Sequence, residues 1–197
     1  MRLLPIALFL LLVGCDAGKS PSTGTATGTA KAARPAWLLP AMVDSVRLAM
    51  EQGERTGDVP VGACVVVGTG AGRIITTGHN TTLSEGNAAG HAEINALTKA
   101  IAAVGGAKNF SAIPRDSIFL ITSFEPCPMC AGAIALWNIP PSQVAVFLPK
   151  LPEWKTPELQ AVQRLRDGWV LTGDDTLQIE FFCRHASFRE AFPHKCR

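Results

Sequence analysis

The apolar positions of the chain recur with two periods, and each period predicts a different kind of element. Spacings of three or four residues predict helices over residues 37–55, 91–104, 129–137 and 186–192. Short β-branched or apolar runs predict strands over residues 61–67, 74–80, 117–123, 143–148 and 177–183. Because a helix intervenes between the third and fourth strands, these two are expected to pair in parallel through a right-handed crossover. The order of elements predicts an α/β fold.

Glycine-rich and polar segments separate these elements. Residues 68–72 form a turn between the first two strands, which are therefore expected to pair as a hairpin. Two further polar segments are predicted loops, residues 81–90 and 109–116. Residues 149–175 have the weakest pattern, which favours a helix over 159–165 and a short strand over 169–171.

The first 14 residues are predicted to be a signal peptide. Arg2 precedes an apolar run, residues 3–13, which is too short for an ordinary membrane-spanning helix and has the length of a signal-peptide core. The run ends Leu-Val-Gly-Cys, which resembles the lipobox of bacterial lipoproteins, so we expect cleavage before Cys15 and lipidation of that residue. A plain signal peptide, or a short anchor with an incidental cysteine, is the alternative. Asp16 resembles an inner-membrane retention signal.

The rest of the chain divides into a tether and one domain. Residues 15–36 consist mostly of Gly, Ser, Thr, Ala and Pro, a composition that cannot bury enough apolar surface to become ordered. Residues 37–197 are expected to form a single packed domain, since 47% of the chain is hydrophobic and 17% is charged. Whichever N-terminal interpretation holds, the domain is expected to be exported. A bacterial lipoprotein would lie on the periplasmic side of a membrane, with the inner membrane favoured.

Zinc-binding residue types are concentrated in two short segments. His91 precedes Cys127 by 36 residues, and Cys130 follows three residues later. A catalytic zinc site uses three protein ligands and keeps one position open for water, and one imidazole with two thiolates supplies that set. Zinc lowers the pKa of water from about 15.7 towards about 7, so hydroxide bound to zinc is the expected nucleophile. Glu93 is close enough to this water to carry protons without ligating the metal.

Both segments lie where helices are predicted to begin. Pro128 falls in a first turn, where proline is tolerated, so two helix N-termini can converge on one metal. Two alternatives remain open. Cys127 and Cys130 alone resemble a thioredoxin-type site, which would make the protein an exported thiol-disulfide oxidoreductase without metal. A catalytically idle binding module is the other alternative, against which the intact Glu93 argues.

Four segments together resemble the cytidine deaminase-like superfamily. They are residues 60–63, 78–80, 91–97 and 122–134. The last two contain His-x-Glu and Pro-Cys-x-x-Cys, the known signature of zinc nucleobase deaminases. Within the superfamily the chain is most similar to the branch that holds bacterial guanine deaminases and tRNA adenosine deaminases. The resemblance implies a three-layer α/β/α sandwich around a mixed five-stranded sheet, and a homodimer.

The resemblance also implies roles for single residues. It places one zinc ion per chain on His91, Cys127 and Cys130. Glu93 becomes the proton shuttle. Asn80 matches the position that hydrogen-bonds the substrate base or sugar, although asparagine is also favoured in turns. The backbone N–H of Ala92 would bind a carbonyl or ring nitrogen of the base, and Phe124 either lines the pocket or belongs to the core.

The charge of the chain bears on the substrate. The formal net charge is +2, and removal of residues 1–14 with their single Arg lowers it to +1, which indicates no strong basic face for tRNA. Export would separate the domain from cytosolic tRNA, and the tail after Cys183 lacks the basic helix typical of tRNA adenosine deaminases. We therefore expect a hydrolytic deaminase that removes an exocyclic amine from a free nucleobase or nucleoside, with guanine-type purines favoured. Deamination of adenosine in tRNA or another RNA is the alternative.

Three cysteines remain outside these assignments. Cys64 falls in a predicted buried strand, where a free thiol behaves as a small hydrophobic group. Cys183 and Cys196 could pair in an oxidising compartment and join the last predicted strand to the last predicted helix. They could equally stay free, because the sequence gives no distance between them.

Overall fold

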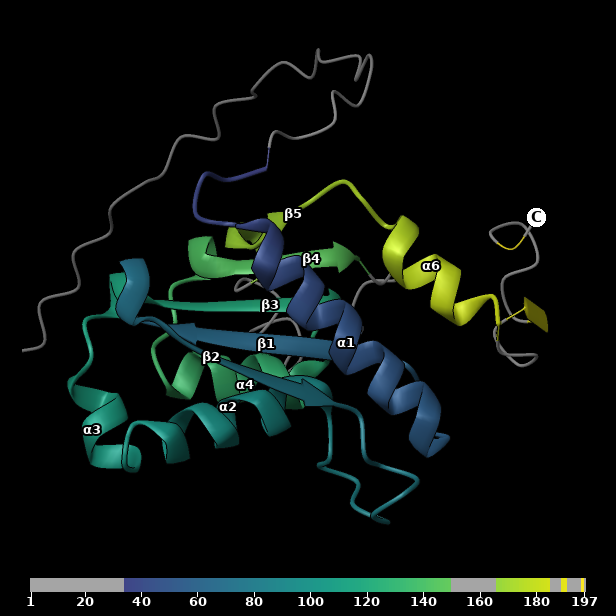
Figure 1. The fold of residues 1–197 in the computed structure, drawn as a ribbon, viewed down its shortest axis with the longest axis horizontal. Helices are drawn as coiled ribbons and strands as arrows, with labels where there is room; N and C mark the ends of the chain where they lie inside the picture. The colour runs from purple at the N-terminus through teal and green to yellow at the C-terminus, as the bar shows by residue number, and fades with distance from the viewer. Residues whose placement is uncertain (1–33, 150–165, 185–188, 191–195, 197) are drawn as a thin grey trace, which may run out of the picture. The chain divides into compact units, whose positions relative to one another are not determined.

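The computed structural model describes residues 34–149, 166–184, 189–190 and 196. Its helices are α1 (Pro40–Thr56), α2 (Ala92–Ala103), α3 (Ala107–Ala112), α4 (Pro128–Leu136) and α6 (Thr176–Phe182). Its strands are β1 (Gly62–Val67), β2 (Ile74–His79), β3 (Ile118–Phe124), β4 (Val144–Leu148) and β5 (Val170–Leu171). Figure 1 shows the strands side by side in a sheet with helices on both sides, an α/β arrangement.

The strands form one mixed sheet in the order β2-β1-β3-β4-β5. β1 pairs antiparallel with β2 and with β3, whereas β3, β4 and β5 run parallel to one another. In the hairpin, Ala63 stands opposite Gly78, and on its other side it stands opposite Thr122. These pairings confirm the predicted hairpin, the parallel crossover through α4 and the mixed five-stranded sheet.

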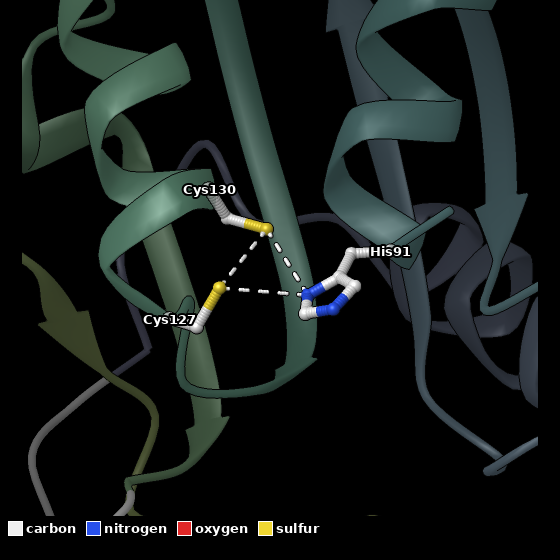
Figure 2. Close-up of side chains that lie close together, drawn as sticks. All are labelled: His91, Cys127 and Cys130. Carbon is white, nitrogen blue, oxygen red and sulfur yellow. Dashed lines mark hydrogen bonds between the residues drawn. The ribbon is translucent and has the colours of Figure 1, made fainter. Parts of the chain in front are cut away.

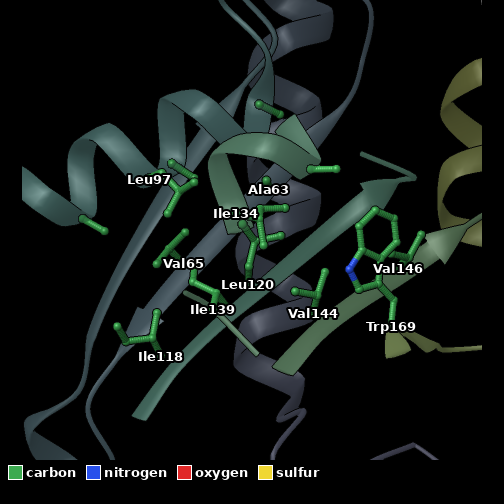
Figure 3. Close-up of a cluster of buried hydrophobic side chains, with 14 of the residues drawn as sticks. Ala63, Val65, Leu97, Ile118, Leu120, Ile134, Ile139, Val144, Val146 and Trp169 are labelled. Carbon is green, nitrogen blue, oxygen red and sulfur yellow. The ribbon is translucent and has the colours of Figure 1, made fainter. Parts of the chain in front are cut away.

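Helices cover the sheet on both faces. α2 and α4 pack on one face, where Leu97 and Ile134 join a buried cluster with the strands (Figure 3). α1 and α6 pack on the other face, where Met50 and Phe181 belong to a second cluster. β1 is buried along its whole length, as expected of a strand covered on both sides. The three-layer α/β/α sandwich is therefore confirmed.

Two glycines allow helices to approach the sheet closely. A Cβ atom at Gly62 would lie closer than 3.0 Å to the α1 atoms of Val46 and Met50. A Cβ atom at Gly78 would come equally close to the backbone of Ala92 and to backbone atoms that lie one turn further along α2. Side chains cannot make such contacts without a shift of the helix. Gly78 therefore sets the distance between β2 and the first turn of α2, which follows His91.

The structure contradicts two predicted elements. Residues 177–183, predicted as the fifth strand, lie mostly in the helix α6, because the buried side chains of Leu177 and Phe181 are four positions apart. The predicted loop over 109–116 contains most of α3, where Phe110 is fully buried. The fifth strand is instead the two-residue β5, which lies within the short strand predicted over 169–171.

Several predictions concern residues outside the described ranges. They are the signal peptide over 1–14, the lipidated Cys15, nearly all of the tether, the helix over 159–165 and most of the helix over 186–192. Among the residues that the structure does describe, none belongs to a helix with the length and apolar character needed to cross a membrane.

The structure pairs two of the cysteines whose state the sequence left open. Cys183 and Cys196 form a disulfide with a Cα–Cα distance of 5.3 Å. Because Cys183 follows the end of α6, the disulfide links the C-terminal residues to a helix and not to a strand as predicted. Cys64 is a free and buried thiol in β1, as expected.

Candidate metal centre and active site

His91 and Glu93 are positioned by the start of α2. His91 has an extended backbone as the N-cap residue (φ −76°, ψ 152°). Asn95 fixes the entry into the helix, since its Nδ2 donates to the His79 carbonyl at 2.8 Å and to Thr81 Oγ1 at 3.1 Å. The first N–H groups of a helix have no acceptor within it, so the positive end of the helix dipole lies at this point. Glu93 in the first turn is only 3% exposed.

The first turn of α4 presents the two cysteines. Pro128 is the first helical residue, where its missing N–H breaks no hydrogen bond, and Cys127 is the N-cap. The N–H of Ala131 donates to the Cys127 carbonyl at 2.8 Å and closes the turn. A spacing of three residues places Cys130 on the same side of the helix as Cys127. Both sulfurs therefore lie on the side that faces His91 (Figure 2).

The three predicted metal ligands meet in a compact triangle (Figure 2). His91 Nδ1 lies 3.5 Å from each of the Cys127 and Cys130 sulfurs, and the two sulfurs are 3.7 Å apart. Tetrahedral zinc, with bonds of about 2.3 Å to sulfur and about 2.0 Å to nitrogen, requires S–N distances of about 3.5 Å and an S–S distance of about 3.8 Å. The triangle therefore fits zinc. Among the described residues, these three form the group of His, Cys, Asp or Glu side chains that could hold a metal ion.

The charge states within the site follow from burial and hydrogen bonding. Burial is the main cause that raises the pKa of Glu93 to about 7, and the charge of Cys127 adds to the rise. The hydrogen bond between the Cys127 and Cys130 sulfurs is the main cause that lowers the pKa of Cys127 to about 5. A thiolate, the form that binds metals, is thus favoured at Cys127. Glu93 Oε2 lies 3.5 Å from Cys130 Sγ, beside the triangle.

Two residues of the triangle, His91 and Cys127, line a cavity of about 190 Å³. Apolar and polar groups share its wall, which consists of Val59, Val61, Asn80, His91, Ala92, Glu93, Phe124, Glu125 and Cys127. Asn80 also forms a turn, because its Oδ1 accepts from the N–H and the hydroxyl of Thr82 at 2.9 and 2.7 Å. Ala92 is the first residue of α2, where the N–H has no acceptor within the helix. Phe124 serves both the wall and the core, since its ring packs edge-on against Phe182.

Two acidic residues near the site were missed by sequence reasoning. Asp58, fully buried between α1 and β1, accepts the N–H groups of Leu83 and Ser84 in the loop that leads to His91. Glu125 lines the cavity and pairs with Arg166. The place of Glu125, two residues before Cys127 in the segment that carries the family resemblance, was a signal that could have drawn attention to it. Asp58 had no comparable signal.

Comparison with known proteins assigns the family. The sequence matches the family described as "Cytidine and deoxycytidylate deaminase zinc-binding region" over residues 37–146, and the chain belongs to this family. The tRNA-specific adenosine deaminase of Bacillus subtilis (strain 168) is 34% identical over 100 residues, which are 51% of this chain and 56% of that protein. The guanine deaminase of the same organism is 40% identical over 75 residues, which are 38% of this chain and 42% of that protein.

These matches define a class and leave the substrate open. The chain spans about half the length of the curated relatives it matches. A solved structure of NE0047 in complex with 2,6-diaminopurine has the same fold, with a TM-score of 0.54, 22% sequence identity, and coverage of 72% of this chain and 77% of that one. The protein is thus a member of a zinc-type deaminase family with relatives that act on a free base or on tRNA.

Proposed function

We propose that the protein is a zinc-dependent hydrolytic deaminase that removes an exocyclic amine from a free nucleobase or nucleoside, with guanine-type purines favoured. The observation that carries the proposal is the triangle of His91, Cys127 and Cys130, of which His91 and Cys127 line one cavity together with buried Glu93. A structural zinc site is closed and needs no such carboxylate. A thiol-disulfide oxidoreductase would leave His91 and Glu93 without a role.

Different residues of the cavity would carry out different steps of deamination. Zinc held by the three ligands would make a water molecule acidic enough to supply hydroxide at neutral pH. Glu93 would accept one proton from the attacking water and pass it to a ring nitrogen as the C–O bond forms. It would then accept the second proton from the added hydroxyl group and pass it to the amine, so that the C–N bond breaks and ammonia leaves. Its Oε2 lies within 3.5 Å of Cys130 Sγ, so the carboxylate can act beside the ligand triangle without joining it.

Other groups of the cavity orient the base. With its Oδ1 engaged by Thr82, Asn80 offers its amide NH₂ group as a hydrogen-bond donor. The N–H of Ala92 is a second donor, suited to a carbonyl or ring nitrogen of the substrate. Val61 and Phe124 provide apolar surface that can pack against the ring and exclude water from the reaction.

The size of the cavity favours a small substrate. Its volume of about 190 Å³ lies below the range of about 300–1,000 Å³ typical of pockets for drug-sized ligands. A single base therefore suits it well. Deamination of adenosine in RNA is the second candidate, favoured by the similarity to the tRNA-specific adenosine deaminase of Bacillus subtilis. That candidate predicts a local basic patch and binding that weakens with salt.

The proposal includes export and a lipid anchor. Its support is the sequence alone, namely the apolar run over residues 3–13 and the lipobox-like residues that end at Cys15. A homodimer is proposed from the family resemblance. Incorporation of labelled palmitate in a bacterial host tests the anchor, and Cys15→Ser should abolish it. Labelling of Cys15→Ser at the wild-type level would refute lipidation at this residue.

Ammonia release and metal content, measured on the same sample of the full chain, test the catalytic proposal. The panel is guanine, adenine, cytosine, their nucleosides and a tRNA anticodon stem-loop, with Glu93→Ala as the control. We expect about one zinc per chain and Glu93-dependent turnover of one base or nucleoside. Turnover of the stem-loop alone would favour the RNA candidate. A chain without zinc and with a reducible disulfide between Cys127 and Cys130 would favour the redox alternative.

A further inference from the structure

A buried ion pair joins the turn before Cys127 to the C-terminal part of the chain. The Arg166 guanidinium reaches both oxygens of the Glu125 carboxylate, with Nε 2.5 Å from Oε1 and Nη2 3.0 Å from Oε2. The two side chains are 16% and 3% exposed. Two parallel N–H···O bonds of this kind fix the relative orientation of the groups as well as their distance.

The backbone of Arg166 is itself fixed by a hydrogen bond and by packing. It begins the 3₁₀ helix η4 (Arg166–Gly168), and its carbonyl accepts the N–H of Trp169 at 2.9 Å. Trp169 is buried in the cluster beneath α4 (Figure 3). A Cβ atom at Gly168 would lie 2.6 Å from the Cβ of Pro141, so η4 packs directly against the segment that leads into β4. The backbone of Arg166 is therefore anchored against the sheet and its core.

Glu125 connects this anchor to the metal ligands. Its N–H donates to the carbonyl of Leu148 at the end of β4, at 3.0 Å. Cys127 follows two residues later, and the intervening Pro126 has a fixed φ angle, so the connection is short and stiff. Glu125 and Cys127 line the same cavity. A change in the orientation of Glu125 therefore reaches the Cys127 sulfur.

We propose that Arg166 is a positioning residue of the metal centre. Through Glu125 it holds the turn that places the Cys127 sulfur at the distance from His91 that zinc requires. The inference rests on the proposed zinc function, and it gives a role to a segment whose sequence pattern is weak. An ion pair that only stabilised the fold would leave the affinity for metal unchanged, so measurement can separate the two roles.

Zinc affinity of the full chain, measured by competition with a chromophoric chelator, tests the proposal. We expect Arg166→Met to weaken zinc binding about 10–100-fold, the usual effect of losing groups that orient metal ligands. Arg166→Lys keeps the positive charge but cannot form two parallel hydrogen bonds with Glu125. Its zinc affinity should therefore lie between those of the wild type and Arg166→Met. The matched control is Arg184→Met, which removes exposed ion pairs to Glu54 and Glu180 and should change zinc affinity less than about twofold.

Two further measurements separate positioning from folding. The visible spectrum of the cobalt-substituted chain reports the geometry of the thiolate ligands, and thermal unfolding of the metal-free chain reports the fold. We expect Arg166→Lys to alter the cobalt spectrum while the metal-free melting temperature stays close to that of the wild type. Wild-type zinc affinity in both Arg166 variants, whatever their melting temperatures, would overturn the proposal.

A double variant covers the case in which Arg166→Met does not fold. Glu125→Gln/Arg166→Met removes both charges of the ion pair, so no buried carboxylate is left without the guanidinium of Arg166. Weak zinc binding by the folded double variant supports positioning, and wild-type affinity overturns it. Because activity is not used here, a wild-type chain that binds zinc and deaminates no panel member counts against the proposed function alone. A wild-type chain that binds no zinc overturns both.

Discussion

The two faces of the sheet are built alike, but only one of them carries the candidate site. On one face α1 approaches β1 at Gly62, and on the other α2 approaches β2 at Gly78. Each face has its own cluster of buried apolar side chains. The face of α2 and α4 differs because the first turns of its helices also bury Glu93 and Cys130.

The difference between the two faces shows how the candidate site lowers the stability of the fold. On the face of α1 and α6, the helix side chains form exposed ion pairs such as that of Arg184 with Glu180, which contribute little stability. On the other face Glu93 is buried, and burial raises its pKa to about 7. A buried carboxylate is unfavourable for stability, and active sites commonly retain such groups for function. Substitutions on the two faces should therefore have different consequences.

Glu93→Gln should have the largest effect on turnover. An amide of the same size cannot carry the proton, so we expect kcat to fall about 10²–10⁴-fold while the zinc content stays unchanged. The matched control is Glu180→Gln on the opposite face, which should leave kcat within about twofold. Ammonia release and zinc content of the same samples measure both effects. A wild-type rate in Glu93→Gln would exclude Glu93 as the proton carrier.

Alanine at the two glycines tests the comparison directly. A Cβ atom at Gly62 or Gly78 would collide with helix backbone, so each substitution forces a helix to move. We expect each to lower the free energy of unfolding by about 3 kcal/mol. Only Gly78→Ala should also weaken zinc binding, because α2 follows directly on His91. Denaturant unfolding of the zinc-free chain and zinc titration measure the two effects, and equal loss of zinc affinity in both variants would show that the faces are not independent.

The sequence pattern predicted most of the face that carries the candidate site, because the signals for its strands and helices lie within short segments of the chain. β1, β2 and α2 each combine a clear period with a glycine or polar boundary, and the structure places them within a few residues of the predicted ranges. The metal ligands were predicted from the known signature of zinc nucleobase deaminases, together with residue types that bind zinc and the spacing of Cys127 and Cys130. In the structure the three residues lie close enough together to hold a metal ion.

What the sequence did not reveal depends on contacts between distant residues. The pattern from Leu177 to Phe182 alternates over too few positions to distinguish the two periods, and burial in a cluster with Met50 selects the helix. Asp58 and Leu83 are 25 residues apart, and Glu125 and Arg166 are 41 apart. Pairs at such separations leave no local pattern. The supports of the site were therefore harder to predict than the ligands themselves.

Loss of the disulfide between Cys183 and Cys196 should change stability and leave the site intact. The bond ties the end of α6 to the C-terminal residues, across a sequence separation of 13. For a loop of this size, cross-linking stabilises by about 3 kcal/mol, so the Cys183→Ser/Cys196→Ser variant should lose up to that amount. Zinc affinity should not change, because neither sulfur belongs to the ligand triangle. Alkylation of both cysteines in the native protein without reductant would contradict the bond.

The Asp58 carboxylate, whose pKa is lowered, connects the α1 side of the sheet with the loop that leads to His91. It lies between α1 and β1, accepts N–H groups of Leu83 at 2.8 Å and Ser84 at 3.1 Å, and accepts the Thr56 hydroxyl at 2.8 Å. Burial alone would raise the pKa of Asp58, but the hydrogen bonds from Ser84, Thr56 and Leu83 outweigh it and lower the pKa from 3.8 to about 2. A group with a lowered folded pKa stabilises the fold above its unfolded pKa and loses that contribution as the pH falls through the folded pKa.

Asp58→Asn is expected to have the smallest effect, and it tests how separate the two faces are. At pH 7 it should lower the free energy of unfolding of the zinc-free chain by about 2 kcal/mol. The difference from the wild type should shrink as the pH falls from 3.8 towards about 2. Asp44→Asn, on the exposed side of α1, should differ from the wild type by less than about 0.5 kcal/mol. A difference for Asp58→Asn that did not vary with pH would contradict the lowered pKa. If Asp58→Asn also weakens zinc binding at neutral pH, the loop before His91 depends on the α1 side of the sheet, and unchanged affinity would show that Asn95 and α2 hold the ligand by themselves.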